Sequence, residues 1–482
     1  MSVELYEPVI GLECHIQLLT NSKMYSSDST SFGDMPNTHI SEITLGYPGT
    51  LPKVNKKALE FAVKLGLSVN ANITGFNGFA RKNYFYPDLP KGYQITQDKT
   101  PVCTGGKITF RKKDGTLKEV RLIRIHMEED AGKNLHDLDP DESLVDFNRA
   151  GTPLLEMVSE ADIRSGEEAY LYLQTIRKLV RYLEICDGNM EEGSLRCDVN
   201  VSVRKKGETK FGTKVEVKNI NSFRNVQRAI DYEIQRQIDL LEKGETIISE
   251  TRSFDAIKGI TFSLRTKELA NDYRYFPEPD LPPILITQEY IQNIRQTLPP
   301  LPDELYAKYT TQYQLSDYDA SVITEDKEFA LWFNELCQHT SNYKSAANWL
   351  TVVIKAYLNE TALHISDFKI KPNQIAQIIH LIDNDKISYT AATQKLFPTL
   401  LNNPGKDIEE LCKELDIFKN TNVSDLQPLI EDVFKKYPEK IAEYKAGKKG
   451  LLGLFVGEVM KLSKGKADPK LVNQIVKEKL EG

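Results

Sequence analysis

The chain has 482 residues, and at about 150 residues per domain this length predicts about three domains. Hydrophobic residues make up 40% and charged residues 27% of the sequence, a composition that excludes disorder over most of the chain. No apolar run approaches the ~18 residues that a membrane span requires. The acidic N-terminus also lacks the basic region of a secretory signal. We therefore expect a cytoplasmic protein that does not bind a membrane.

The net charge of −7 argues against binding of nucleic acid through the overall charge of the protein. It does not exclude a local basic patch that binds nucleic acid. The six cysteines include no C-x-x-C pair. In a cytoplasmic chain, such scattered cysteines are expected to be reduced residues of the core.

Segments with alternating apolar and polar residues dominate the chain up to about residue 290 and predict β-strands. The clearest are Val9–Leu18, Val120–Met127, Leu195–Val203 and Lys214–Lys218. The dipeptide Asp114-Gly115 predicts the turn of a hairpin between Lys107–Arg111 and Leu117–Ile125.

Two helices interrupt these strands. The first begins at Ser165, which forms a capping-box pattern with Glu168. The second has an apolar stripe from Phe223 to Leu241 and ends at Gly244. Because strands and helices do not alternate as βαβ units, we predict an α+β fold in which the N-terminal catalytic domain has a mixed or antiparallel sheet.

Prolines between residues 277 and 302 predict a domain boundary near residues 290–300. Beyond this boundary the periodicity is helical. The last two helices are the clearest, one from about Leu451 to Ser463 and one that starts with Asp468 as its N-cap. We predict an α+β catalytic domain at residues 1–294, an all-α helical domain at 295–408 and a helical tail domain at 409–482.

Each of the four predicted strands has a polar face whose side chains are able to bind metals or phosphate. These groups are Glu13 and His15, then Arg124, His126 and Glu128, then Arg196, Asp198, Asn200 and Ser202, and finally Lys214, Glu216 and Lys218. Alternation favours Glu128 over Glu129 as the ligand. Oxygen-rich ligation with one histidine suits Mg²⁺ or Mn²⁺ better than zinc, and neighbouring cations suit a nucleoside triphosphate. The alternative is a set of ordinary solvated strand faces.

Two basic segments are weaker candidates for binding. Arg81–Tyr93 is predicted to be a long aromatic and basic loop, suited either to phosphate or base binding or simply to packing. The tail concentrates lysines, including Lys464 and Lys466. They predict a patch that binds a nucleic-acid backbone, with ordinary surface lysines as the alternative.

Six motifs resemble those of one family, the B subunits of bacterial aspartyl/glutamyl-tRNA amidotransferases. They are GLECHIQL at Gly11–Leu18, RKNYFYPDLPKGYQITQ at Arg81–Gln97, HMEEDAGK at His126–Lys133, DFNRAGTPLLE at Asp146–Glu156, MEEGSLRCDVNVSVR at Met190–Arg204 and DYRYFPEPDLPP at Asp272–Pro283. The motifs occur in order, and the tail also resembles the tRNA-binding end of the family. The chain is identified as a member of this family.

The resemblance implies a ligase that amidates glutamate or aspartate misacylated onto tRNA for glutamine or asparagine. ATP and Mg²⁺ (or Mn²⁺) would phosphorylate the side-chain carboxylate, and ammonia would then displace the phosphate. The partners implied are an amidase A subunit that supplies ammonia from glutamine and a small C subunit, in a heterotrimer. Phosphorylation is chemically sensible, because a carboxylate is a poor acceptor for ammonia until it has a leaving group.

The resemblance also implies roles for single residues. Glu13, His15 and Glu128 would be catalytic and hold a first metal ion, and Asp198 and Glu216 would hold a second. The implied nucleotide or substrate contacts are Lys82, Tyr84, Arg149, Thr152 and Lys218. Lys464 and Lys466 in the tail would contact tRNA.

The sequence departs from the family pattern in one place. Many members have C-x-C and C-x-x-C motifs in the segments that read Met24–Asp28 and Ser41–Thr44 here. Because these cysteines are absent, we expect no structural zinc and expect packing to hold this stretch.

Two rival functions remain open. A ligase that acts on a free small carboxylic acid predicts that the helical C-terminal third is dispensable for activity. A non-catalytic tRNA-binding scaffold predicts that Glu13→Gln or His15→Ala leaves activity intact, whereas deletion of the tail abolishes tRNA binding. The sequence does not distinguish glutamyl-tRNA from aspartyl-tRNA as the substrate.

Overall fold

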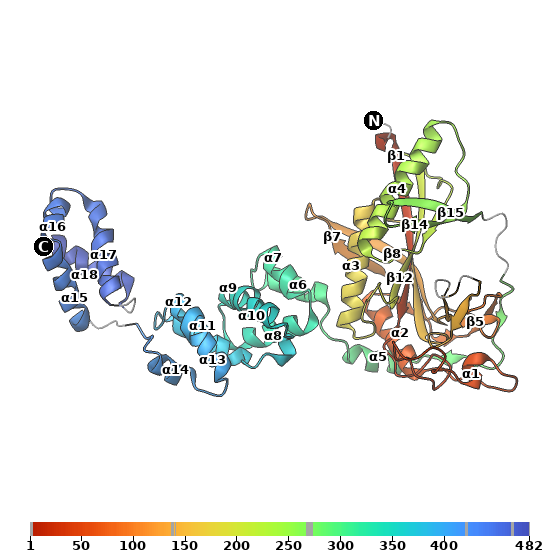
Figure 1. Cartoon of the computed structure of the whole chain (residues 1–482), viewed down its shortest axis with the longest axis horizontal. Helices are drawn as coiled ribbons and strands as arrows, with labels where there is room; N and C mark the ends of the chain where they lie inside the picture. Colours follow the sequence, from red (N-terminus) through yellow and green to blue (C-terminus); the bar gives the residue numbers. More distant parts are fainter. Residues whose placement is uncertain are drawn as a thin grey trace. The chain divides into compact units, whose positions relative to one another are not determined.

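The computed structural model describes residues 3–135, 139, 141–266, 273–419, 423–463 and 467–481 (Figure 1). The chain forms two compact units, Met1–Pro302 and Asp303–Gly482. The strands of the described residues all lie in the first unit, and the second unit is helical. This confirms the predicted α+β region followed by an all-α region. The finer division at residues 294 and 408 stays a prediction.

The first unit is built on a ten-stranded sheet. Its strand order is β15 (Ile260–Thr266), β14 (Glu250–Asp255), β13 (Val215–Lys218), β12 (Leu195–Lys205), β1 (Tyr6–Gln17), β11 (Pro153–Ser159), β8 (Leu117–Glu129), β6 (Cys103–Thr104) and β2 (Asn72–Ile73), with β7 (Lys107–Arg111) paired to β8. The predicted strands and the predicted β7–β8 hairpin are therefore confirmed.

One connection in the sheet differs from the prediction. Strands β13 and β14 pair in parallel, and helix α4 (Phe223–Glu242) connects them, which makes one βαβ unit. The other neighbouring strands of the sheet pair antiparallel. A parallel pair requires a crossover of a dozen or more residues, and the segment that contains α4 supplies it. The sheet is thus mixed, within the predicted fold class.

Helices α3 (Gly166–Tyr182) and α4 lie on one face of the sheet (Figure 1). The apolar residues of β1 point toward this face: Leu12, Cys14 and Ile16 belong to the same buried cluster as Leu173 and Ile176 of α3. Since side chains alternate along a strand, Glu13 and His15 point to the opposite face. The core therefore fixes which residues remain for chemistry.

The helix cap at Ser165 forms only half of the predicted capping box. Ser165 Oγ accepts a hydrogen bond from Glu168 N at 3.1 Å, as expected for an N-cap. The Glu168 carboxylate accepts from the backbone N–H of Arg164 at 2.9 Å, one residue before the cap. The second predicted helix also forms, and Gly244 follows it with a φ of 74°.

Residues 76–96 and 273–286 form two small sheets beside the large one. Strand β4 (Ala80–Asn83) pairs with β5 (Tyr93–Thr96) and with β16 (Phe276–Pro277), while β3 (Phe76–Asn77) pairs with β17 (Ile284–Leu285). The prediction of a loop over all of Arg81–Tyr93 is wrong at its ends, because β4 and β5 form a hairpin and only residues 84–92 connect them. Arg81 fixes the second segment: its Nε donates to Glu278 Oε2 at 2.7 Å.

The two segments that lack cysteines contain a hydrogen-bonded cluster around Asp28. Asp28 Oδ2 accepts bonds from Ser26 Oγ at 3.0 Å and from Ser41 Oγ at 2.8 Å. It also accepts from the Thr44 hydroxyl and from Ser41 N. Met24 and Tyr25 are buried beside it. Packing, which was predicted, and these hydrogen bonds together hold the stretch that precedes helix α2 (Lys56–Ser68).

The remaining helices of the first unit are α1 (Glu42–Leu45), α2 (Lys56–Ser68) and α5 (Gln288–Gln296), and a short pair, β9 (Lys133–Leu135) and β10 (Leu144–Asp146), completes its strands. The α-helices of the second unit are α6 (Pro302–Thr311), α7 (Asp317–Ile323), α8 (Lys327–His339), α9 (Tyr343–Asn348), α10 (Lys355–Thr361), α11 (Pro372–Asp383), α12 (Tyr389–Ala391), α13 (Phe397–Asn402), α14 (Ile408–Glu414), α15 (Val423–Lys436), α16 (Pro438–Lys445), α17 (Leu452–Leu462) and α18 (Pro469–Glu481). In the part of the chain that the structure describes, no helix is both long and apolar enough to cross a membrane.

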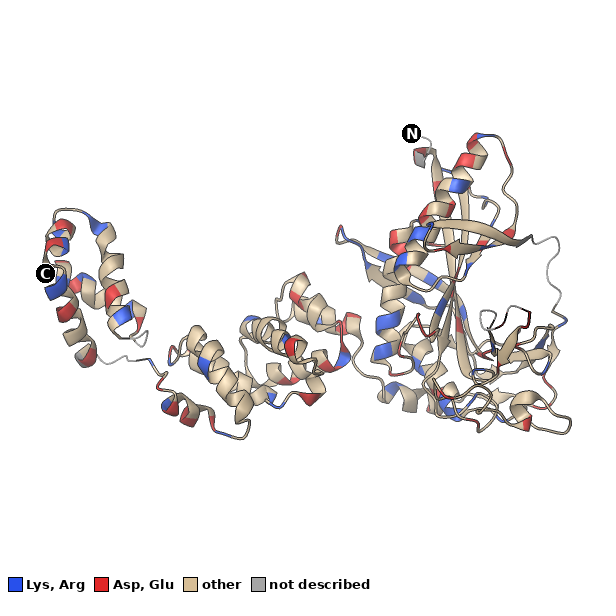
Figure 2. Cartoon of the chain, viewed as in Figure 1, with Lys and Arg blue, Asp and Glu red and all other residues tan. Residues whose placement is uncertain are grey.

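Helices α15 to α18 share a core of their own, which includes Leu426, Val459 and Val472. The predicted N-cap of α18 is confirmed, because Asp468 Oδ1 accepts from Lys470 N at 2.7 Å. Basic and acidic residues mix along these helices (Figure 2), and Lys436 Nζ lies 2.9 Å from Glu458 Oε2. Lys464 and Lys466, predicted to contact tRNA, lie outside the described residues.

Candidate active site

Four polar residues form one row across the centre of the large sheet. In the strand register, Arg196 of β12 lies opposite His15 of β1, and His15 lies opposite Glu156 of β11. Glu156 in turn lies opposite His126 of β8. Residues directly opposite each other on paired strands point to the same face. The row therefore faces away from α3 and α4.

The side chains of this row converge with Glu13 and Glu128. His15 Nε2 lies 3.4 Å from Glu156 Oε2 and 3.7 Å from both Glu13 Oε1 and Glu128 Oε1. His126 Nε2 lies 3.3 Å from Glu128 Oε2 and 3.5 Å from Glu156 Oε2. The structure thus brings together Glu13, His15 and Glu128, predicted as ligands, with His126, predicted for the same polar face, and adds Glu156. We call these five residues the carboxylate–histidine cluster.

The negative charge of the carboxylates in this cluster is balanced in part by a proton on His15. Burial lowers the pKa of His15, but its hydrogen bond with Glu156 and the charge of Glu128 raise it more, to about 9. Burial raises the pKa of Glu156, but its hydrogen bond with His15 and the charge of that imidazole bring it down to about 2. Burial and the Glu156 charge raise the pKa of Glu13. Three carboxylates are thus held together by a protonated histidine, and a cation could replace that proton.

His126 orients two of the carboxylates. Arg124 Nε donates to His126 Nδ1 at 3.3 Å, so in the neutral ring the proton is on Nε2. Nε2–H is then the donor toward Glu128 and Glu156. Arg124 also places its Nη2 3.7 Å from Glu156 Oε1. His126 thus acts as a donor that fixes the carboxylates, and His15 is the better candidate for a metal ligand.

The donor atoms fit a hard divalent ion. One atom each from Glu13, His15 and Glu156 lies within 4.8 Å of the others, and the same holds for His126, Glu128 and Glu156. Carboxylate oxygens with one imidazole suit Mg²⁺ or Mn²⁺. The sequence missed Glu156 because β11 is buried on both faces and shows no alternation. The available signal was a charged residue in an otherwise apolar strand, since buried carboxylates need partners.

The predicted second metal site has an ammonium group between its carboxylates. Lys218 Nζ lies 2.6 Å from Asp198 Oδ2 and 3.6 Å from Glu216 Oε1. Thr251 Oγ1 donates to Glu216 Oε2 at 2.9 Å. Asp198 lies opposite Glu13 in the strand register, so this group adjoins the carboxylate–histidine cluster. The assignment of Asp198 and Glu216 to a metal stays a prediction.

Of the predicted substrate contacts, Lys82 lies in β4 of the small sheet and Tyr84 follows this strand, and Thr96 of the paired strand β5 donates to Glu128 Oε2 at 3.3 Å. Lys82 Nζ lies 4.9 Å from the centre of the Tyr273 ring and 5.8 Å from that of Tyr84. Its charge contributes to the lowered pKa of Glu156. Burial and the charge of Glu128 raise the pKa of Tyr84.

Arg149 and Thr152 lie in the turn before β11. Arg149 donates to two backbone carbonyls, to Ala131 O at 3.0 Å and to Gly132 O at 2.6 Å, and its Nε lies 3.7 Å from Asp130 Oδ2. Asp130 also binds Arg196 of the row at 2.8 Å. Thr152 is buried, and its N–H donates to Arg149 O at 3.0 Å. These contacts fix the turn, and substrate contact by either residue stays a prediction.

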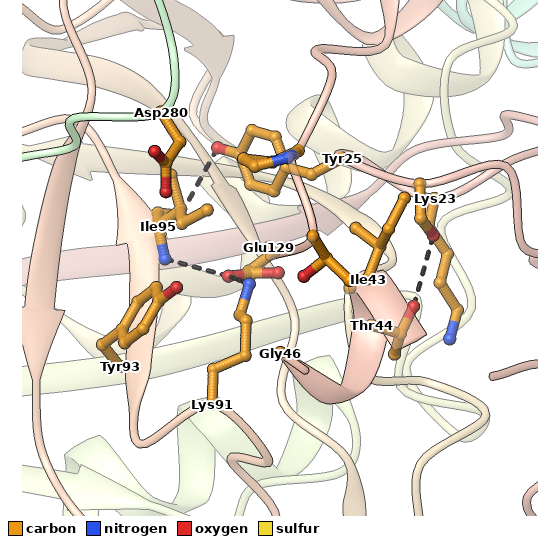
Figure 3. Close-up of a pocket in the computed structure, with 14 residues that line it drawn as sticks. Lys23, Tyr25, Ile43, Thr44, Gly46, Lys91, Tyr93, Ile95, Glu129 and Asp280 are labelled. Atoms are coloured by element: carbon orange, nitrogen blue, oxygen red, sulfur yellow. Dashed lines mark hydrogen bonds and ion pairs between the residues drawn. The ribbon is translucent and has the colours of Figure 1, made fainter. Parts of the chain in front are cut away.

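Glu129, the last residue of β8, lines a pocket (Figure 3). Its lining includes Lys23, Tyr25, Lys91 and Glu129. Lys91 forms an ion pair with Glu129, and Ile95 N donates to Glu129 Oε1 at 2.9 Å. Glu129 lines this pocket and Glu128 contacts His126, so the two glutamates occupy different faces as predicted, and the choice of Glu128 as the ligand stays a prediction.

Comparison with protein families identifies the class of protein to which the chain belongs. Residues 8–292 match the family model described as the GatB/GatE catalytic domain, and residues 331–480 match the model described as the GatB domain. The chain thus combines a catalytic domain with a helical region of one class of amidotransferase subunit.

Relatives cover the full length. The chain is 48% identical to the B subunit of the aspartyl/glutamyl-tRNA(Asn/Gln) amidotransferase of Thermodesulfovibrio yellowstonii, over 98% of both chains. It is also 48% identical to that of Persephonella marina, over 98% of this chain and 99% of the relative. The chain therefore belongs to the family of aspartyl/glutamyl-tRNA(Asn/Gln) amidotransferase B subunits, as its motifs predict.

Proposed function

We propose that the chain amidates glutamate or aspartate that is misacylated onto tRNA for glutamine or asparagine. The carboxylate–histidine cluster is the observation that supports this function best. It gathers three carboxylates and two imidazoles on one sheet face, with Lys82, Arg124 and Arg196 beside them. An acidic ion site surrounded by cations suits transfer of a phosphoryl group from ATP.

The proposed reaction has two steps. A side-chain carboxylate oxygen of the aminoacyl-tRNA attacks the γ-phosphorus of ATP, the bond to the leaving ADP breaks, and an acyl phosphate forms. The nitrogen of ammonia then attacks the acyl carbon, the bond to phosphate breaks, and a proton leaves as the amide forms. Cations are needed in the first step, because the carboxylate and the triphosphate repel each other. Lys82 and Arg124 are the proposed phosphate contacts.

Glu13, His15, Glu128 and Glu156 would hold Mg²⁺ or Mn²⁺ in this function. When bound, the ion would neutralise charge on the transferring phosphoryl group. His126 and Arg124 hold Glu128 and Glu156 in place through their N–H groups. Asp198 and Glu216 are proposed for a second ion, which would compete with the Lys218 ammonium for the same oxygens. Tyr84, Arg149, Thr152 and Lys218 complete the proposed substrate contacts.

The same proposal includes partners. An amidase A subunit would supply ammonia from glutamine, and a small C subunit would complete the heterotrimer. The three domains would be residues 1–294, 295–408 and 409–482, with tRNA bound in part by the tail, including Lys464 and Lys466. Since tRNA is the substrate carrier, we propose that the protein acts in the cytoplasm.

The test is co-expression with the two partner subunits, followed by an assay with glutamyl-tRNA, ATP, Mg²⁺ and ammonium. Wild type should form glutaminyl-tRNA, and Glu13→Gln should lose this product while tRNA still binds. Glu119→Gln is the control, since Glu119 is 55% exposed on β8 and pairs only at the surface with Lys107.

Other outcomes would contradict the proposal. If Glu13→Gln matches wild type, the cluster is not the site, and a non-catalytic scaffold is favoured. If free glutamate is amidated as well as glutamyl-tRNA, the small-molecule ligase is favoured. If neither glutamyl-tRNA nor aspartyl-tRNA yields product with wild type, the proposed activity is wrong.

A further inference from the structure

Four tyrosines form a cluster at the edge of the candidate active site. Tyr84 and Tyr86 follow β4, and Tyr273 and Tyr275 precede β16. The Tyr84 ring centre lies 6.4 Å from that of Tyr86 and 6.0 Å from that of Tyr273, and the Tyr273 centre lies 6.2 Å from that of Tyr275. Interplanar angles of 61° to 79° make each contact edge-to-face. In each edge-to-face pair the edge of one ring contacts one face of the other, so three such contacts among four rings leave several ring faces uncovered by the cluster itself.

The cluster is not part of the buried core. Tyr86 is 57% and Tyr275 43% exposed, and Tyr84 and Tyr273 are half-buried. Backbone bonds hold the two segments together: Asn83 N donates to Tyr273 O at 2.9 Å, and Asn83 Nδ2 donates to Arg274 O at 2.8 Å. The rings are therefore positioned by their strands, and part of their aromatic surface reaches solvent.

The cluster adjoins the groups proposed to transfer phosphate. Thr96 of β5 donates from Oγ1 to Glu128 Oε2 at 3.3 Å, and β5 pairs with β4, the strand that Tyr84 follows, so the hairpin beside the tyrosines contacts the carboxylate–histidine cluster. Lys82 of β4 adjoins the tyrosines. Its Nζ is 4.9 Å from the Tyr273 ring centre, and its charge also acts on Glu156.

We propose that the tyrosine cluster stacks on an adenine ring, with Lys82 directed at a phosphate of the same nucleotide. Solvent-accessible aromatic rings beside a cation are the usual platform for a nucleobase. The inference rests on the proposed function, in which adenine arrives from two sources, ATP and the 3′-terminal adenosine of tRNA. The chemistry of recognition is the same for both, and the experiment distinguishes them.

The variants are Tyr275→Leu, which removes the ring, and Tyr275→Phe, which keeps it. Tyr318→Leu is the matched control, because Tyr318 is 74% exposed in the helical unit. In the assembled complex, the KM for ATP, the KM for glutamyl-tRNA and the inhibition constant of inorganic tripolyphosphate are measured. Tripolyphosphate has no base, so it reports phosphate binding alone.

If the ring stacks on ATP, Tyr275→Leu raises the KM for ATP about tenfold, and the tripolyphosphate constant is unchanged. If it stacks on the tRNA terminus, the KM for glutamyl-tRNA rises by a similar factor and that for ATP is unchanged. In either case Tyr275→Phe and Tyr318→Leu behave as wild type. Tyr84→Leu is the second ring-removing variant and should affect the same substrate.

The inference is overturned if both leucine variants leave both KM values within about twofold of wild type. It is also overturned if Tyr275→Phe is as impaired as Tyr275→Leu, because the hydroxyl would then be the active group. Should wild type form no product, the proposed function fails separately. Equilibrium dialysis with labelled ATP and filter binding of tRNA then decide the inference on the same variants, and equal affinities in both would refute it.

Discussion

Buried carboxylates lie against both faces of the large sheet, and the two sets differ in how their negative charge is balanced. On the helix-covered face, Glu233 of α4 is fully buried and accepts bonds from Arg236 at 3.0 Å, Gln237 at 3.0 Å and Thr261 at 2.9 Å. On the other face, Glu13, Glu128 and Glu156 share the two imidazoles His15 and His126.

This difference in charge balance distinguishes a carboxylate that stabilises the fold, Glu233, from the carboxylates of the cluster, which are suited to binding a cation. Every partner of Glu233 is a permanent donor, and two of its neighbours, Arg236 and Arg252, are always charged. In the carboxylate–histidine cluster, a proton on His15 balances part of the negative charge of the carboxylates. A buried group that is fully paired stabilises the fold. One that depends on exchangeable protons is ready to bind a cation.

The largest expected effect is on activity at the cluster. Glu13→Gln should lower the rate of amidation more than about 100-fold, because it removes a proposed ligand. Its stability should be equal to or slightly above that of wild type, since burial and Glu156 already disfavour the charged form of Glu13. Thermal unfolding of the same preparation checks this. A fall in stability that parallels the loss of activity would contradict the comparison.

The opposite result is expected on the helix-covered face. Glu233→Gln should lower the free energy of unfolding by about 2 kcal/mol, because the half-buried Arg236 and Arg252 lose one carboxylate partner and keep Glu250. The rate per folded molecule should stay within about threefold of wild type. Urea unfolding and amidation assays of the complex measure the two quantities. Loss of activity without loss of stability would show that both faces are functional.

His126 allows a finer test of the cluster. His126→Ala should weaken Mn²⁺ binding about 10- to 100-fold, as expected when an outer donor to ligating carboxylates is removed. His126→Gln should retain most of the affinity, because its amide N–H can replace Nε2–H. Isothermal titration with Mn²⁺ compares the two variants. Equal and complete loss of binding in both would mean that His126 ligates the ion directly.

The smallest effect is expected at Lys23, a buried cation in the pocket of Figure 3. Its Nζ donates to two backbone carbonyls, His39 O at 2.6 Å and Phe147 O at 3.3 Å. Burial lowers its pKa from 10.5 to about 8. The unfolded chain therefore binds more protons between these values, and stability should rise with pH across this window by about 1–3 kcal/mol. Lys23→Met should flatten this rise in urea unfolding between pH 8 and 10. An unchanged slope would show that Lys23 is not its source.

Much of the fold follows from the sequence because local patterns determine it. Alternation along β1, β8, β12 and β13 placed their polar residues on the correct face, and Asp114-Gly115 placed the hairpin. The parallel pairing of β13 with β14 was not predicted. It joins residues such as Glu216 and Thr251, which are far apart in the sequence, and no local pattern specifies such a contact.

The site was predictable only where a strand has one polar face. Glu13, His15 and Glu128 alternate with buried apolar residues and were found. Glu156 lies in a strand that is buried on both sides, and Glu233 interrupts an apolar helix stripe. In both cases burial of a charge depends on partners from other elements. The sequence shows the charge but not the partners.

The most direct test of the central claim separates phosphorylation from amidation. ADP release by the complex is measured with glutamyl-tRNA and ATP, in the absence of ammonium and glutamine. The account predicts that wild type releases ADP and that this release requires glutamyl-tRNA. Glu233→Gln should do the same at a temperature where that variant is folded, whereas Glu13→Gln should release no ADP. Equal ADP release by Glu13→Gln and wild type would contradict the assignment of phosphoryl transfer to the carboxylate–histidine cluster.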